Sequence, residues 1–133
     1  KFQKISKEDA LTPENIYHRT VLGEDSYNRE LISLDTKKVD DLLKKTPDFY
    51  ISENGESNII NNRYEGVKKY FETGRDINAT KLCLSEENGE LTASITDGRH
   101  RFAVMRDMGL TKIKFAVDKL SLPLAYKYGL IAE

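Results

Sequence analysis

A glycine at position 98 separates two regular hydrophobic patterns, and this junction constrains the fold more than any other stretch. Residues 91–95 alternate apolar and small polar side chains, as a half-buried strand does. Residues 102–108 then follow a helical pattern, which Gly109 ends. Residues 97–101, with the sequence Asp-Gly-Arg-His-Arg, are therefore expected to join a strand to the first turn of a helix.

The chemistry of this junction favours an anion. The first turn of a helix has backbone N–H groups without intrahelical partners and the positive end of the helix dipole. Arg99 and Arg101 offer planar donor groups that suit phosphate oxygens, and His100 can donate a hydrogen bond or exchange a proton near neutral pH. Phosphate is the first ligand to consider, although the same residues also fit a solvated helix end at which Asp97 pairs with an arginine.

At these residues the chain resembles the ParB/sulfiredoxin-like superfamily, whose members carry an Asp-Gly-x-His-Arg or Gly-x-x-Arg signature between a strand and a helix. The order of elements is similar over about residues 60–119: a helix at 63–72, hairpin strands at 80–84 and 91–95, the motif with its helix, and a strand at 112–117. The resemblance implies an α+β fold, a single domain with a small mixed β-sheet and packed helices. Residues 60–133 would form the core, and residues 1–59 a helical and loop extension packed on it.

Members of this superfamily share the handling of a nucleotide or phosphate at the turn. They include partition proteins that bind and hydrolyse CTP, nucleases, a free-serine kinase, and sulfiredoxin, which uses ATP to repair oxidised peroxiredoxin. Sulfiredoxin has a nucleophilic cysteine where this chain has Arg99, and Cys83 falls in the first hairpin strand, so we do not expect sulfiredoxin chemistry. Partition proteins add a DNA-reading helical domain after this one, and we expect none in the residues that remain here.

If the motif is functional, its residues have distinct predicted roles. Gly98, Arg99 and Arg101 would bind phosphate. The N–H groups after Gly98 would meet the phosphate oxygens, and the two arginines would neutralise the charge that builds up in phosphoryl transfer. Positioning and electrostatics supply most of the catalysis in such reactions. Asp97 and His100 would be the catalytic residues, with Asp97 also a possible ligand for Mg²⁺ and His100 a donor or general acid. ATP or CTP is the nucleotide that the resemblance suggests. Glu72 and Asp76 are candidates for a second carboxylate.

Composition sets limits on the partners. The formal net charge is −1, which argues against a strong general affinity for nucleic acid, but residues 98–119 hold six Lys or Arg against two Asp. A single cysteine cannot form an internal disulfide, and no Cys/His cluster has the spacing of a zinc site. No apolar run is long enough to cross a bilayer and no signal peptide is recognisable, so we expect a cytoplasmic protein without a membrane partner.

Three kinds of function remain open. The first is an enzyme that cuts or transfers phosphate on a nucleotide or a nucleic-acid backbone, either a nuclease or an NTP hydrolase or phosphotransferase. The start without methionine would fit an excised toxin or effector domain, whose partner would be an inhibitor or immunity protein. The second is a nucleotide- or DNA-associated binding module without catalysis. The third is an interaction domain that uses the cationic patch to dock an acidic partner.

The first half of the chain gives weaker signals. Ser6 and Thr12 have the pattern of helix N-caps. Residues 23–30 are predicted to be a loop, residues 39–43 an amphipathic helix, residues 49–51 a short strand and residues 52–62 an exposed loop. Asn62 is predicted to cap the next helix, whose apolar face would include Tyr64, Val67, Tyr70 and Phe71. The pair His18-Arg19 is more simply a surface pair than a second phosphate contact.

Overall fold

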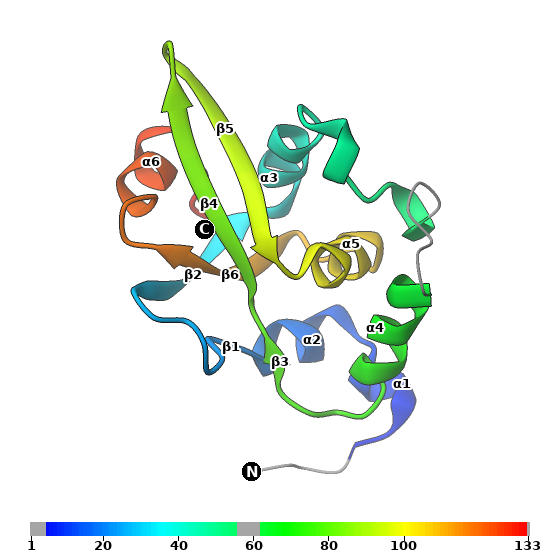
Figure 1. Cartoon of the computed structure of the whole chain (residues 1–133). Coiled ribbons are helices and arrows are strands. Elements are labelled where there is room, and N and C mark those ends of the chain that lie inside the picture. The colour runs from blue at the N-terminus through cyan, green and yellow to red at the C-terminus, as the bar shows by residue number, and fades with distance from the viewer. Residues whose placement is uncertain (1–4, 56–61, 133) are drawn as a thin grey trace.

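The main feature of the fold is a four-stranded mixed sheet. The computed structural model describes residues 5–55 and 62–132, apart from the side chain of Asp48. The strand order is β2-β6-β4-β5, with β6 parallel to β4 and the two outer pairs antiparallel. The strands are β2 (Arg29–Asp35), β4 (Thr80–Glu87), β5 (Glu90–Asp97) and β6 (Lys112–Asp118). Figure 1 shows the β4–β5 hairpin rising beyond the rest of the sheet. The small mixed sheet with its packed helices confirms the expected α+β class.

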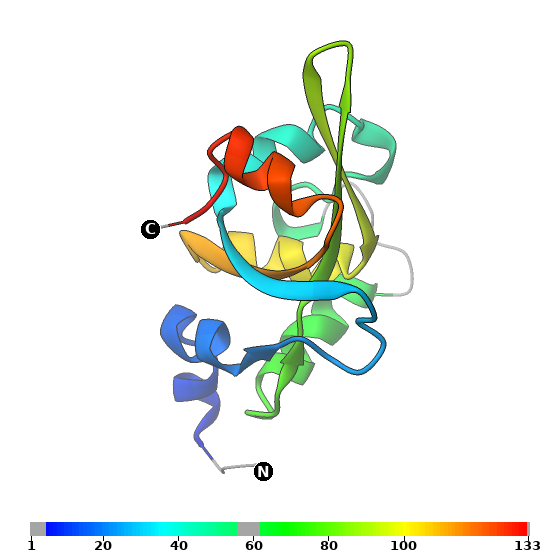
Figure 2. The ribbon, with the colours of Figure 1, turned by 90° about the vertical axis from the view of Figure 1, so that its left-hand side faces the viewer.

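Helices lie on both sides of this sheet. They are α1 (Lys7–Ala10), α2 (Pro13–Arg19), α3 (Thr36–Leu43), α4 (Arg63–Phe71), α5 (Arg99–Asp107) and α6 (Leu122–Lys127), with 3₁₀ helices η1 (Pro47–Phe49) and η2 (Glu53–Gly55). Figure 2 shows α6 on the near side of the hairpin and α3 and α5 on the far side. A second, two-stranded parallel sheet joins β1 (Thr20–Val21) to β3 (Ile77–Asn78) beside α2.

The hairpin forms as its turn sequence predicts. Glu87 pairs with Glu90, so the connection is the two residues Asn88 and Gly89. Both have positive φ, 54° and 78°, the conformation that a tight turn between twisted strands requires. The hairpin therefore brings the end of β5, and with it Asp97, back to the start of β4.

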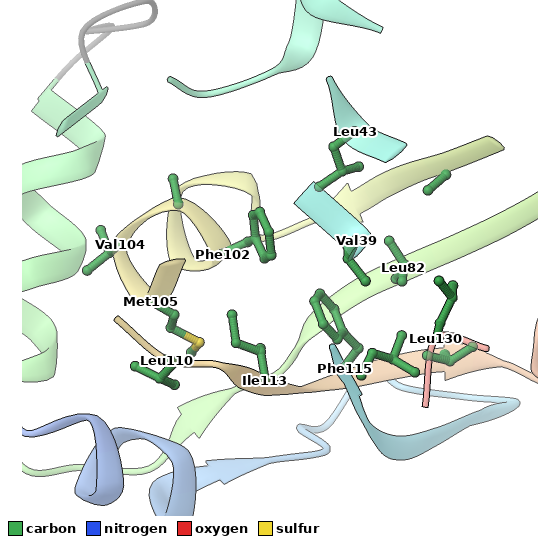
Figure 3. Packing of buried hydrophobic residues seen from close by; sticks show 14 of the residues in the cluster. Val39, Leu43, Leu82, Phe102, Val104, Met105, Leu110, Ile113, Phe115 and Leu130 are labelled. Atoms are coloured by element: carbon green, nitrogen blue, oxygen red, sulfur yellow. The ribbon is translucent and has the colours of Figure 1, made fainter. Parts of the chain in front are cut away.

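The core between the sheet and the far-side helices fixes the position of α5. Phe102 of α5 packs on Phe115 of β6, with ring centroids 5.8 Å apart. Val39 and Leu43 of α3 approach the same sheet face beside Leu82 (Figure 3). All five side chains are buried, and each contributes about 1.5–3 kcal/mol to folding by leaving water. The first turn of α5 is thus held against a rigid surface.

Local capping signals in the N-terminal half are partly confirmed. The hydroxyl of Ser6 accepts a hydrogen bond from the N–H of Asp9, and that of Thr12 accepts one from Asn15, so α1 and α2 begin as predicted. The prediction for Asn62 is wrong: its φ is 53° and its side chain makes no capping bond. Tyr70, predicted to be on the apolar face of α4, is 44% exposed.

Three other predictions for the N-terminal half are corrected. Residues 29 and 30, predicted to be loop, belong to β2, which pairs along its length with β6. Phe49 ends a 3₁₀ helix that Pro47 begins, so residues 49–51 do not form a strand. Arg19 is no surface pair: its guanidinium donates to three backbone oxygens, those of Ala10, Phe71 and Arg75, at 2.7–2.9 Å. That arginine holds α1 and α2 against the end of α4.

Candidate functional site

The turn between β5 and α5 requires glycine. Gly98 has φ +99°, a conformation that L-residues with side chains rarely adopt. A Cβ at this position would lie 2.8 Å from Nη2 of Arg101 and 3.0 Å from Oγ1 of Thr80. The Thr80 hydroxyl donates a 3.1 Å hydrogen bond to the Gly98 carbonyl, which fixes the peptide at the start of α5. The backbone at the turn is therefore held in one conformation.

The first turn of α5 opens into a groove. The earliest hydrogen bond of the helix runs from the N–H of Phe102 to the Gly98 carbonyl, and Gly98 has no side chain to cap the preceding N–H groups. The groove has a volume of about 610 Å³ and lies between this turn and α4, which packs on α5 (Figure 1). We call it the phosphate groove, after the ligand that the sequence predicts for residues 97–101. Its lining residues are Arg63, Gly66, Val67, Tyr70, Phe71, Asn78 and Thr96 together with residues 97–101.

All five residues of the predicted motif line the phosphate groove. The Asp97 carboxylate is 62% exposed and accepts a 3.4 Å hydrogen bond from Nη2 of Arg101, whose side chain is 24% exposed. An ion pair of this length and exposure contributes only about 0.2–1 kcal/mol, so both groups can exchange this contact for a ligand. Arg99 has its guanidinium 5.5 Å from the ring centroid of Phe49. His100 is 8% exposed, so most of its imidazole lies within the wall of the groove.

The other predicted charges are not gathered at the groove. Neither Glu72 nor Asp76 is among the described residues that line it. Glu72 instead lies 4.0 Å from the ammonium of Lys7. The basic residues of 98–119 are also dispersed, because the ammonium groups of Lys112 and Lys114 on β6 lie 4.9 Å and 4.6 Å from the ring of Tyr17 on α2. The six cations therefore do not form one patch.

Arg63, at the start of α4, is a groove residue that sequence reasoning missed. It lies outside the motif, and only the packing of α4 on α5 brings it to the turn. The signal that could have found it is weak: a basic residue opening the helix that precedes the hairpin. With Arg63, the groove is lined by three arginines and one aspartate.

A second cluster of polar side chains lies at the other end of α5, around Arg106. Its Nη1 donates to Asp40 Oδ1 at 3.2 Å, to Tyr50 Oη at 3.1 Å and to the Ile51 carbonyl at 2.7 Å. Its Nε donates to Asp107 Oδ1 at 2.9 Å. This arginine therefore attaches residues 50 and 51 to both α3 and α5.

Asp107 extends the cluster to two further segments. Its Oδ2 accepts hydrogen bonds from the hydroxyl of Tyr64, at 2.6 Å, and from the N–H of Asn54, at 2.8 Å. Burial opposes the charge on Asp107, but the bonds from Arg106, Tyr64 and Asn54 outweigh it and hold the pKa of that carboxyl below its usual range. Burial and the hydrogen bond to Asp40 raise the pKa of Tyr50 to about 12. The cluster is an ionised, hydrogen-bonded support for residues 50–55 and α4.

Residues 5–55 and 62–132 were searched for metal-binding groups and for membrane-spanning helices. No group of three or more His, Cys, Asp or Glu side chains in these ranges could hold a metal ion. Across the same ranges, no helix has both the length and the apolar character to span a bilayer.

Comparison of the chain with models of protein families, with curated proteins and with solved structures gave no match.

Proposed function

We propose that this protein binds the phosphate groups of a nucleotide, or of a nucleic-acid backbone, in the phosphate groove. The observation that carries the proposal is the charge of the lining: three arginines and the uncapped first turn of α5 face one aspartate. The whole chain has a net charge of −1, so the positive excess of the groove is local and does not reflect a basic protein as a whole.

Arg101 is the residue on which phosphate binding depends most directly. Its guanidinium is held beside the turn by Asp97 at 3.4 Å and would exchange that contact for phosphate oxygens. A charge-assisted hydrogen bond contributes about 1.5–3 kcal/mol, so we expect Arg101→Ala to weaken triphosphate binding by about tenfold to a hundredfold. Lys37→Ala is the matched control, because it removes one positive charge from an 84% exposed side chain of α3, outside the groove.

The test is titration calorimetry with ATP, CTP and inorganic tripolyphosphate at a fixed ionic strength. Loss of affinity in Arg101→Ala but not in Lys37→Ala supports the groove. Equal affinities in the wild type and both variants would place phosphate elsewhere on the protein.

A second proposed function is phosphoryl transfer or hydrolysis in the same groove. It is favoured by one observation: an exposed carboxylate, Asp97, and an imidazole, His100, stand on the same turn as the phosphate-binding arginines. Mg²⁺ is commonly held by one or two carboxylates together with substrate phosphates, and Asp97 is the carboxylate that would supply a ligand here. The ion would neutralise charge on the phosphate, and Asp97 would orient the attacking water or hydroxyl.

Turnover is tested separately from binding. Labelled nucleotides, plasmid DNA and RNA are incubated with the protein in magnesium and in EDTA. We expect Asp97→Ala and His100→Ala to abolish turnover while thermal unfolding still shows a folded protein. Wild-type turnover in both variants would remove these residues from the mechanism and leave a binding module.

A further inference from the structure

A second cavity adjoins the phosphate groove on the other side of Arg99. Its volume is about 710 Å³, and it shares Thr96 and Arg99 with the groove. We call it the aromatic pocket. Its lining also includes Lys45, Phe49, Tyr50, Ile51, Phe102 and Arg106. A ligand with two chemically different ends can therefore occupy both cavities at once, one end on each side of Arg99.

The walls of the aromatic pocket suit a planar, weakly polar group. Rings of Phe49, Tyr50 and Phe102 line it, along with aliphatic side chains, Lys45 and Arg106, whereas the phosphate groove is lined by three arginines, one aspartate and one histidine beside fewer rings. Phe49 is 67% exposed, although phenylalanine is among the residue types most often buried. The guanidinium of Arg99 lies 5.5 Å from the Phe49 ring centroid. An exposed ring beside an arginine is the combination on which nucleic-acid bases stack.

Hydrogen bonds of the Arg106 cluster hold one wall of the aromatic pocket in place. The Ile51 carbonyl and the Tyr50 hydroxyl both accept hydrogen bonds from Arg106, at 2.7 Å and 3.1 Å. The Tyr50 hydroxyl also donates to Asp40 at 3.0 Å. Binding in a preformed pocket avoids the entropic cost of ordering the segment around it.

We propose that the aromatic pocket holds the base of a nucleotide unit, stacked on Phe49, while the phosphates of the same unit lie in the phosphate groove. This inference rests on the proposed function. Tyr70 is the alternative ring on which the base could stack, since it is 44% exposed and lines the phosphate groove. The hydroxyl of Tyr70 donates to the Asp76 carbonyl at 2.8 Å, and Tyr70 lines the cavity that the phosphates themselves would fill. The base therefore goes to Phe49.

Tryptophan fluorescence tests the stacking directly. The sequence holds no tryptophan, so Phe49→Trp places the sole indole at the rim of the pocket. We expect ATP and CTP to quench this indole and inorganic tripolyphosphate to leave its emission unchanged. A signal unaltered by saturating nucleotide would overturn the assignment.

Affinity supplies the second measurement. We expect Phe49→Ala to weaken ATP or CTP binding about fivefold to a hundredfold, the range found for removing one stacked base, and to leave tripolyphosphate binding unchanged. Arg101→Ala should weaken all three probes. Tyr126→Ala is the matched control, because this tyrosine of α6 is 64% exposed and lines neither cavity. Phe49 is exposed, so its replacement is compatible with folding, which thermal unfolding checks.

The outcomes separate the two proposals. If Phe49→Ala binds nucleotide as the wild type does, or if Tyr70→Ala shows the loss instead, the aromatic pocket is refuted and the phosphate groove stands. If none of the three probes binds, the proposed function fails, and the base assignment fails with it. The affinity for a short oligothymidine, measured in parallel, distinguishes a nucleic-acid strand from a free nucleotide as the ligand. If Phe49→Ala weakens oligothymidine binding, the base belongs to a strand. If Phe49→Ala weakens only ATP or CTP binding, the base belongs to a free nucleotide.

Discussion

Replacing Gly98 by alanine tests whether the backbone of the β5–α5 turn is as constrained as its geometry indicates. A residue with a side chain pays about 1–2 kcal/mol for a left-handed conformation such as φ +99°. The new Cβ would also lie 3.0 Å from Oγ1 of Thr80, which is fully buried and cannot move away. Disturbing its hydrogen bond to the Gly98 carbonyl costs about 1 kcal/mol. The expected loss of unfolding free energy is therefore about 2–3 kcal/mol.

Thermal unfolding followed by circular dichroism measures this loss. For a chain of 133 residues, an unfolding entropy of about 2.1 cal/mol/K per residue converts 2–3 kcal/mol into a Tm lower by about 7–11 °C. Gly66→Ala is a control for which we expect a change in unfolding free energy of the opposite sign. Gly66 lies within α4, and a Cβ added there would have no heavy atom within 4 Å. It should raise stability by about 0.5–1 kcal/mol. A Gly98→Ala protein as stable as the wild type would refute the reasoning.

The Arg106 cluster gives two further predictions. Tyr64→Phe keeps the buried ring but removes the 2.6 Å hydrogen bond to Asp107, so urea unfolding should show a loss of about 1.5–3 kcal/mol, whereas Tyr126→Phe on the surface should show none. The pKa of Asp107 is lower in the folded state, so its contribution is complete above its unfolded pKa of about 4 and is lost as pH falls through the folded value. The difference in unfolding free energy between the wild type and Asp107→Asn should narrow below about pH 4. A difference that stays constant as the pH falls well below about 4 would contradict the ionised cluster.

Elements with complete local signals could be predicted from the sequence. Asn88-Gly89 supplies both residues that the hairpin turn needs, and its prediction is confirmed. The strand β6 alternates as predicted at its start, with Ile113 and Phe115 buried. The helix α5 begins directly after the left-handed Gly98, where the change of hydrophobic period predicts it. In each case, residues close in sequence determine the conformation.

Elements whose position depends on distant contacts could not be predicted in this way. Leu31 and Ile32 of β2 are exposed and half-buried, so the strand lacks a clean alternation, and its pairing with β6 sets its position. Residues 49–51 have strand-forming side chains, but Pro47 starts a 3₁₀ turn and Arg106 binds the Ile51 carbonyl. Tertiary contacts outweigh local propensity at both places.

The residues of the candidate site also fall into those that the sequence could predict and those that it could not. The motif of residues 97–101 could be read from the sequence because it is contiguous. Arg63 and Phe49 could not, since one comes from α4 and the other from the segment after α3, and only the packed fold brings them to the two cavities beside the turn. The Arg106 cluster, which binds their neighbours Tyr50 and Tyr64, has no sequence signature of its own.

The left-handed torsion at position 98 affects how an alignment of related chains should be interpreted. A glycine retained there would report only that the bend must form, because any side chain would collide with Thr80 whether or not a ligand binds. Invariance at Arg63 and Arg99 would be more informative, since neither arginine is demanded by that bend. Evolutionary evidence for activity should therefore be sought in the guanidinium groups and not in the glycine that presents them.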